Sequence, residues 1–421
     1  MKRNLAFMAL LIVLVMIPSA AKAKEALTLE RCIAIALANH PELAEYNAQV
    51  KAKEGAAEQN AAQLRPTLSI ASNIAEEKNN DYSSVNISVN QLLWDGNQSQ
   101  KAIEASMAQK YAVSCQLERK RQEIVYLVKQ AFFETLKAEK ALDVANISME
   151  YYEKNLKQAK SYHEAGLAAK SDVTSAQVDL SQAKMDLIEA QSNFKKAMAN
   201  LQNVLGIQSP LSEMEIKDSV QGKEPSSPLI PNETKTITQV IENRPDIVAQ
   251  KHYIEAAKHN LDLQARSNNI SLSAYADYGL DLSGEDQEDY SLGVELSATL
   301  WDGGTLSGKI KEARGELESA IASYRSQVNS ALLEIKTSLL ELEEERHNVE
   351  LTSLLVEQAK ENLDLALGRY KAEVGSSLEV SKALKDYHEA LKEHNEAIYN
   401  LRIAEAQLEY AAGLWKGANS K

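Results

Sequence analysis

Few side chains in this sequence are spaced so that they could carry catalysis or bind a metal ion. Glu344 and His347 have the i, i+3 spacing that supplies half of a di-iron site on a helix, but no second such motif occurs. With 60 acidic residues and 7 histidines, one pair of this kind is expected by chance, and we interpret it as structural. Asp302, Gly303 and Gly304 indicate a turn, because the glycine spacing that cradles a phosphate is absent.

The two cysteines, Cys32 and Cys115, are too few for a disulfide framework or a paired-cysteine metal motif. We expect two unpaired thiols, with a single bridge between them as the alternative. No strand-to-helix nucleophile motif occurs either. The sequence therefore predicts no catalytic residue, no metal site and no cofactor, and nothing in it indicates an enzyme.

The charge and composition narrow the class of protein. The formal net charge is −14, which argues against nucleic acid and against anionic lipid surfaces as partners, since both require a basic surface. Aromatic residues make up 5% of the chain, and Ala, Leu, Glu, Lys and Gln dominate. This composition is typical of long helices.

Residues 1–23 have the pattern of an export signal. Lys2 and Arg3 precede an apolar run from Leu5 to Ile17, which is shorter than the ~20 residues of a membrane-spanning helix. Ala21-Lys22-Ala23 offers a small-residue cleavage site, so we predict a mature chain that begins near Lys24, with a retained anchor as the alternative. No later stretch is long and apolar enough for a membrane helix, so an exported chain could cross a membrane only as strands.

The chain contains an internal repeat of about half its length. Trp94-Asp95-Gly96 recurs as Trp301-Asp302-Gly303 at an offset of 207, and Gly206 recurs as Gly413. Between the copies, a segment with Pro210, Gly222 and three further prolines indicates a surface connection. We divide the chain into a first repeat (24–205), a linker (206–232), a second repeat (233–415) and a C-terminal tail (416–421).

Upstream in each repeat, Asn39-His40-Pro41-Glu42 matches Asn243-Arg244-Pro245-Asp246 at an offset of 204. The second repeat therefore carries about three extra residues. We place them in the Gly- and acid-rich segment 283–289, because loops of this composition tolerate insertion.

Each repeat predicts the same elements. Two short helices (28–39 and 41–64) precede a β-hairpin (about 67–94) and a long helical hairpin (about 98–205), whose arms are 98–162 and 172–205. In the second repeat the β-hairpin is expected at about 270–301 and the helical hairpin at about 306–414, with arms 306–369 and 379–414.

The hairpin segments alternate between apolar and polar residues. From Ile270 to Leu282 and from Ser291 to Leu300, every second residue is apolar, over a length that suits the 9–11 residues of a membrane-spanning strand. Trp94, Trp301 and several tyrosines lie near the strand ends, where membrane strands carry aromatic residues. Soluble hairpins with one buried face are the alternative.

Four strands cannot close a barrel, and an open sheet edge in lipid leaves backbone groups unpaired. We therefore expect a trimer with about 12 strands. The predicted fold class is a mixed α and β membrane protein, mainly long antiparallel helices that form an α-helical barrel beneath a trimeric transmembrane β-barrel, with four strands per protomer from two tandem repeats.

These features together resemble the TolC-type outer-membrane efflux proteins. The resemblance covers nearly the whole mature chain and is carried by Leu27–Glu30, both Asn-x-Pro segments, both Trp-Asp-Gly motifs and the turn Gly166–Val173. It implies a homotrimer in the outer membrane, with a 12-stranded β-barrel, a 12-helix periplasmic barrel and an equatorial belt. It also implies an exit duct of tripartite pumps or type I secretion systems, which docks a periplasmic adaptor and an inner-membrane transporter.

The resemblance further implies site residues. A pore gate at the periplasmic helix tips would be formed by Asp172 and Glu379, with Lys382 where the family often has an acid; a helix cap without a gating role is the alternative for Asp172. The tip turns, where an adaptor would dock, are Gly166, Leu167, Ala168, Gly375 and Ser376, and Glu373 departs from the family's glycine. The barrel–helix junctions are Trp94, Asp95, Gly96, Trp301, Asp302 and Gly303.

The predicted function is an outer-membrane exit duct. The alternatives are an exported coiled-coil tether, which would not need detergent for extraction, and a passive porin, which would be richer in strands. The sequence names neither the cargo nor the pump.

Overall fold

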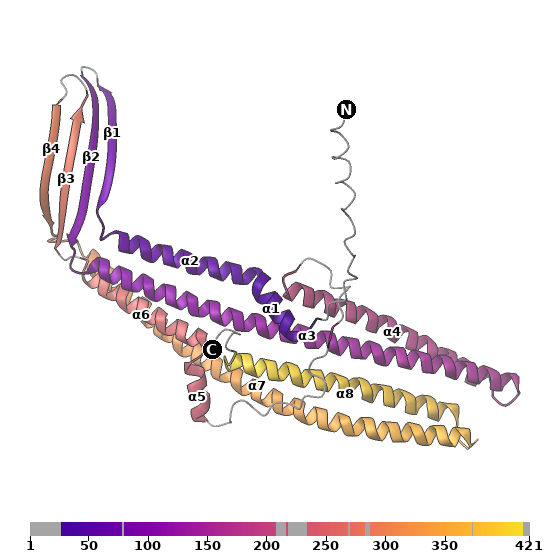
Figure 1. Ribbon diagram of the computed structural model, residues 1–421. Helices are drawn as coiled ribbons and strands as arrows, with labels where there is room; N and C mark the ends of the chain where they lie inside the picture. The colour runs from indigo at the N-terminus through magenta and orange to yellow at the C-terminus, as the bar shows by residue number, and fades with distance from the viewer. Residues whose placement is uncertain are drawn as a thin grey trace, which may run out of the picture.

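The computed structural model describes residues 27–77, 80–207, 216–217, 234–267, 270–282, 287–372 and 374–415. Figure 1 shows an elongated molecule with the β-sheet at one end and long helices that run away from it. The signal segment, most of the linker, Glu373, much of the segment 283–289 and the tail lie outside the described residues.

The two repeats have the same order of elements. The first contains α1 (Leu29–Asn39), α2 (Pro41–Ala62), β1 (Thr67–Glu77), β2 (Asn80–Trp94), α3 (Gln98–Glu164) and α4 (Lys170–Val204). The second contains α5 (Thr234–Glu242), α6 (Pro245–Ala265), β3 (Ser271–Asp281), β4 (Gln287–Ser297), α7 (Thr305–Lys371) and α8 (Ser377–Ala411). Helices α3 and α7 both have 67 residues, and α4 and α8 both have 35.

Some element ends differ from those that the sequence pattern predicts. Helices α4 and α8 begin two residues before Asp172 and Glu379, so these acids lie inside the first turn and not at its start. Strand β4 ends at Ser297, and Trp301 lies in the turn that leads to α7. Alternation alone cannot mark this end, because Ala298 and Leu300 continue the apolar series past the last pair, Ser271 and Ser297.

The four strands form one antiparallel sheet in the order β1-β2-β3-β4. Their registers place most of the large apolar residues of the four strands on one face, where Leu68 is 75% exposed and Leu292 is 83% exposed, whereas Leu92 lies opposite Ser273 on the other face. Two residues separate β1 from β2 and five separate β3 from β4, so the second repeat's three extra residues fall at this connection. The outer edges of β1 and β4 have no partner strand within the described chain.

The long helices α3 and α7 organise the helical part. Helices α2 and α4 pack along α3, and α6 and α8 pack along α7, as Figure 1 shows. The repeats join because α6 and α8 also pack against α3. Helix α3 is thus covered by both repeats, whereas α7 is covered only by its own.

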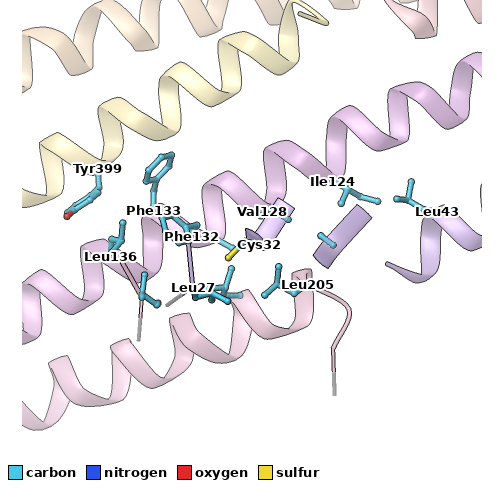
Figure 2. Packing of buried hydrophobic residues seen from close by; sticks show 14 of the residues in the cluster. Leu27, Cys32, Leu43, Ile124, Val128, Phe132, Phe133, Leu136, Leu205 and Tyr399 are labelled. Atoms are coloured by element: carbon cyan, nitrogen blue, oxygen red, sulfur yellow. The ribbon is translucent and has the colours of Figure 1, made fainter. Parts of the chain in front are cut away.

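The largest apolar cluster lies where α1 and the end of α4 meet the middle of α3 (Figure 2). Leu27, Cys32, Phe132 and Leu205 are buried there, and Cys32 is a free thiol. Ile216, in the middle of the linker, is buried in the same cluster and pairs with Leu27 in a short parallel bridge. At this residue the expectation of a surface linker is wrong, because the proline-rich composition does not reveal a single apolar anchor.

Two glycines bring the helix ends against the Asn-x-Pro segments. Gly206 and Gly413 follow α4 and α8 with φ of +67° and +62°, a backbone conformation that glycine adopts without strain. A Cβ at Gly206 would lie 3.1 Å from the carbonyl oxygen of Asn39, and one at Gly413 would lie 3.2 Å from Cγ of Arg244. The same close approach in both repeats explains why both motifs recur.

We predict that Gly413→Ala lowers the free energy of unfolding by about 1–2 kcal/mol, because a Cβ in the left-handed region carries that cost. The measurement is urea unfolding of the protein in detergent. Gly55→Ala is the matched control, since Gly55 lies within α2 with open space around it and should raise stability by about 0.5–1 kcal/mol. Equal effects of the two substitutions would contradict the role of Gly413.

Candidate functional site

The first helical tip is a tight turn between α3 and α4. Gly166 has φ of +75°, and the backbone N–H of Leu167 donates to the carbonyl oxygen of Tyr162 at 2.8 Å, which closes the end of α3. The Asp172 carboxylate accepts a hydrogen bond from the N–H of Ala169 at 3.2 Å. Within one chain Asp172 thus stabilises the start of α4, and Leu167 is left exposed.

The second tip differs in its capping. Ser376 caps α8, since its hydroxyl accepts from the N–H of Glu379 at 3.2 Å. The Glu379 carboxylate lies 3.5 Å from Nε of Arg369, an exposed pair that contributes little stability. Among the described residues, no hydrogen bond or ion pair joins Asp172, Glu379 and Lys382 to one another.

The two helical hairpins meet just above the tips. The Ser381 hydroxyl on α8 donates to the Asp179 carboxylate on α4 at 2.6 Å, and Tyr152 of α3 lies beside both in an apolar cluster drawn from all four long helices. Burial raises the pKa of the Tyr152 hydroxyl to about 12. Sequence reasoning missed this contact, because nothing in the periodicity links α4 to a helix about 200 residues later.

The Trp-Asp-Gly motifs turn the chain from strand into helix. The Asp95 carboxylate accepts from the N–H of Ser99 at 2.7 Å, and the Asp302 carboxylate accepts from the N–H of Leu306 at 2.6 Å. Gly96 and Gly303 have φ of +69° and +67°. Each motif thus supplies a cap for a 67-residue helix and the glycine that permits the turn, while Trp94 and Trp301 remain exposed.

A buried cluster of charges lies at mid-length of the helices. The Arg244 guanidinium, 2% exposed, donates to Asp246 at 2.8 Å, to Glu334 at 2.7 Å and to the carbonyl oxygen of Ala411 at 2.5 Å. The Arg119 guanidinium of α3 donates to the carbonyl oxygen of Tyr410 at 2.6 Å and stacks over that ring. The cluster therefore ties α3 and α7 to the start of α6 and the end of α8.

The electrostatics of this cluster favour its charged form. Burial would raise the pKa of the Asp246 carboxyl, but hydrogen bonds and the charge of Arg244 outweigh burial and hold that pKa below its usual value. Burial and the neighbouring Arg244 lower the pKa of Arg119. Because its carboxylates and guanidiniums are paired with one another, the cluster serves to hold the helices together. The Arg244-Pro245-Asp246 segment was the one signal of this cluster in the sequence.

Other arrangements that could do chemistry are missing from the part of the chain that the structure describes. It holds no group of three His, Cys, Asp or Glu side chains placed to bind a metal ion, and Glu344 and His347 gain no third ligand. No described helix is both long and apolar enough to pass through a membrane.

Comparison with known proteins decides the family. The sequence profile of the family described as outer membrane efflux protein matches residues 32–207 and 236–414, one match for each repeat. The chain belongs to the outer membrane efflux protein family.

Two relatives of the chain are distant from it in sequence. The chain is 21% identical to the outer membrane protein TolC of Vibrio cholerae over 303 residues, which cover 70% of this chain and 68% of TolC. It is 22% identical to the outer membrane efflux protein BepC of Brucella suis over 332 residues, which cover 76% and 71%.

The fold is the one seen in solved structures of this family. The outer membrane protein VceC of Vibrio cholerae superimposes with a TM-score of 0.78 at 19% identity, over 91% of this chain and 96% of VceC. The resemblance to TolC-type proteins and the predicted outer-membrane location are thus confirmed, and the family is one of channel proteins that serve efflux.

We predict that Asp246→Asn destabilises the protein in a pH-dependent way. Because the pKa of Asp246 lies below its unfolded value of about 3.9, its carboxylate contributes stability above about pH 4, and this contribution is lost as the pH falls through the folded-state pKa. The difference in urea midpoint between wild type and Asp246→Asn should therefore be large near pH 6 and shrink below about pH 4.

Asp143→Asn serves as the control for the pH series, since Asp143 forms an exposed pair with Lys140 that contributes little. A difference between wild type and Asp246→Asn that stays constant to low pH would mean that the charge of Asp246 does not stabilise the cluster.

Proposed function

We propose that this chain is one protomer of a homotrimeric outer-membrane exit duct, which serves a tripartite efflux pump or a type I secretion system. In this assembly 12 strands would close a barrel in the outer membrane, and the helices would form a periplasmic barrel beneath it. The proposal is supported by one observation above all: a face of α7 that is exposed in the single chain corresponds, by the repeat, to a face of α3 that is buried.

The half of α3 nearest the sheet is covered by α6, and by the repeat an equivalent helix should cover the same half of α7. Helix α6 lies on α3 between two contacts, in which His259 approaches Glu104 at 3.1 Å and the Tyr253 hydroxyl donates to Gln116 at 3.2 Å. Ala108 and Ala112 are buried between these contacts. Their repeat equivalents on α7, Gly315 and Ser319, are exposed. The surface of α7 that is equivalent to the α6-binding surface of α3 is therefore not covered by any helix of the described chain, and we call this surface the helix seat of α7.

This seat is a groove of about 530 Å³ between α6 and α7, lined by Tyr253, Gly315, Ser319 and Ser323 among others. By the repeat, Ser323 takes the place of Gln116, and α2 of a second copy takes the place of α6. Helix α2 would present Gln49 and Ala52, which are exposed in the single chain, and Ala52 is small enough for close packing.

The lower half of α7 supports the same arrangement. Phe133 on α3 is 5% exposed, whereas its equivalent Leu340 on α7 is 65% exposed. Leu340 belongs to an exposed apolar stripe on one face of α7: Leu333, Leu340, Leu351, Leu354, Leu355 and Leu365. The outer helix α4 carries a matching exposed stripe of Val178, Met185 and Ile188. We therefore infer that α7 packs against α2 and α4 of the next copy.

The sheet demands closure for a different reason. The backbone groups along the outer edges of β1 and β4 are unpaired within the described chain, and in lipid each such group costs several kcal/mol. The exposed apolar face suits contact with lipid, and exposed Trp301 at its margin suits an aromatic belt. Four strands are too few to close a barrel, so several copies must contribute strands. The family resemblance supports a ring of three copies.

The helix tips would contact the periplasmic adaptor. Leu167, Val374 and Leu378 are exposed apolar side chains at the two turns, which suits the docking of a periplasmic adaptor through Gly166–Ala168 and Gly375–Ser376. We assign the pore gate to Asp172, Glu379 and Lys382 of the three copies. An inner-membrane transporter would then deliver the cargo through the adaptor.

The trimer is tested by the mass of the particle extracted in detergent, measured by light scattering with the detergent subtracted. We expect three copies for wild type and dissociation for Leu340→Glu, which places a charge in the seam between copies. Ile147→Glu is the control, because Ile147 is an exposed apolar residue of α3 that lies outside the faces of α3 covered within one chain. A wild-type monomer, or extraction without detergent, would favour a tether.

The gate is tested in planar bilayers. Replacing Asp172, Glu379 and Lys382 together with Ala should raise the single-channel conductance, because the charged ring that narrows the mouth is removed. Unchanged conductance would remove these three residues from the gate and leave Asp172 as a helix cap.

A further inference from the structure

The polar face of the sheet carries one residue that differs from the rest. Side chains alternate between the two faces, and the registers place Thr67, Asn90, Tyr275 and Gly293 in one row across the polar face. Among the strand side chains that the structure describes, those on this face are small, amide or acidic apart from Leu92, which lies opposite Ser273, and Tyr275, the one aromatic ring. Tyr275 is thus the bulkiest of the described side chains on this face.

The Tyr275 ring leans over Gly293 of β4, the residue directly opposite. A Cβ at position 293 would lie 2.6 Å from Oη, 2.7 Å from Cζ and 3.0 Å from Cε1 of Tyr275. The first two distances are shorter than real Cβ contacts, so the ring occupies the space that another residue's side chain would fill. An aromatic ring over a cross-strand glycine is a known way to cover the exposed glycine backbone.

The equivalent pair in the first repeat is built differently. By the repeat offsets, Tyr275 corresponds to Ala71 and Gly293 to Asn86, and Ala71 pairs with Asn86 as Tyr275 pairs with Gly293. The first repeat therefore pairs a small side chain, Ala71, with a medium-sized one, Asn86. The second repeat pairs the largest side chain of the four, Tyr275, with Gly293, which has none. This compensation indicates that the ring and the glycine act together.

We propose that Tyr275 sets the clear width of the duct within the strand region, and that Gly293 is a positioning residue that holds the ring flat against the wall. The proposal rests on the proposed function, under which the polar face lines the passage and three copies of the ring lie at one level. It adds a size-determining residue at a place distinct from the helix tips.

A methyl group at position 293 would force the Tyr275 ring to move. Side chains on a strand stand roughly perpendicular to the sheet unless something holds them down. Asn90 occupies the neighbouring position on β2, and a methyl group at position 293 would take the space over β4. The ring of a Gly293→Ala variant would therefore rise from the wall into the passage.

The test measures the width of the exit in planar bilayers with polyethylene glycols of graded size, added to the side of the strand turns. The largest polymer that still lowers the conductance reports the width at the exit. We expect this size to fall in Gly293→Ala and to return to at least the wild-type value in Tyr275→Ala/Gly293→Ala. Unchanged detergent-extracted mass would show that the variants assemble.

Gly279→Ala is the matched control on the same face. A Cβ at position 279 would lie 2.8 Å from Oδ1 of Asn86, the end of an amide that can rotate aside, so the polymer size should match wild type. An unchanged size in Gly293→Ala, or an equal reduction in the double variant, would overturn the role of Tyr275 alone. A wild-type protein that forms no channel would overturn the proposed function together with this role.

Discussion

The buried guanidinium of Arg244 is the centre of the charge cluster through which Arg119 of the first repeat is tied to the second repeat. Moving such a charge out of water costs several kcal/mol, so it is stable only where carboxylates and carbonyl oxygens surround it. Its partners come from α6, α7 and the end of α8, and Arg119 extends the cluster to α3. The helices extend far from the cluster in both directions. Because the cluster holds them together at mid-length, it determines how they run side by side.

The repeats share a backbone but not their chemistry. Gly206 and Gly413 make the same close approach with the same sign of φ, because no other residue type allows it without strain. The side chains that surround them differ: Glu42 pairs with Lys120 in one repeat, and Asp246 accepts from Gln327 in the other. Constraints on the backbone have thus outlasted the duplication, while side-chain pairs have diverged.

The divergence between α3 and α7 follows their surroundings. Both helices have 67 residues, yet α3 is covered by both repeats and α7 by one. In place of the buried Ala108, Ala112 and Phe133 of α3, α7 carries the exposed Gly315, Ser319 and Leu340. A helix that stayed in water along this face would gain nothing from a leucine stripe, so the stripe favours the proposed packing of one copy against the next.

The sequence by itself determined the elements, the duplication and the family. Helix and strand periods, the prolines before α2 and α6 and the caps at Asp95 and Asp302 are local signals, carried by residues a few positions apart. Only the tertiary structure decided the contacts between distant residues: Arg119 with Tyr410, Ser381 with Asp179, Ile216 in the first core and Tyr275 over Gly293. Such contacts depend on which faces of separate elements meet, and that choice is made by packing, which leaves no periodic trace in one sequence.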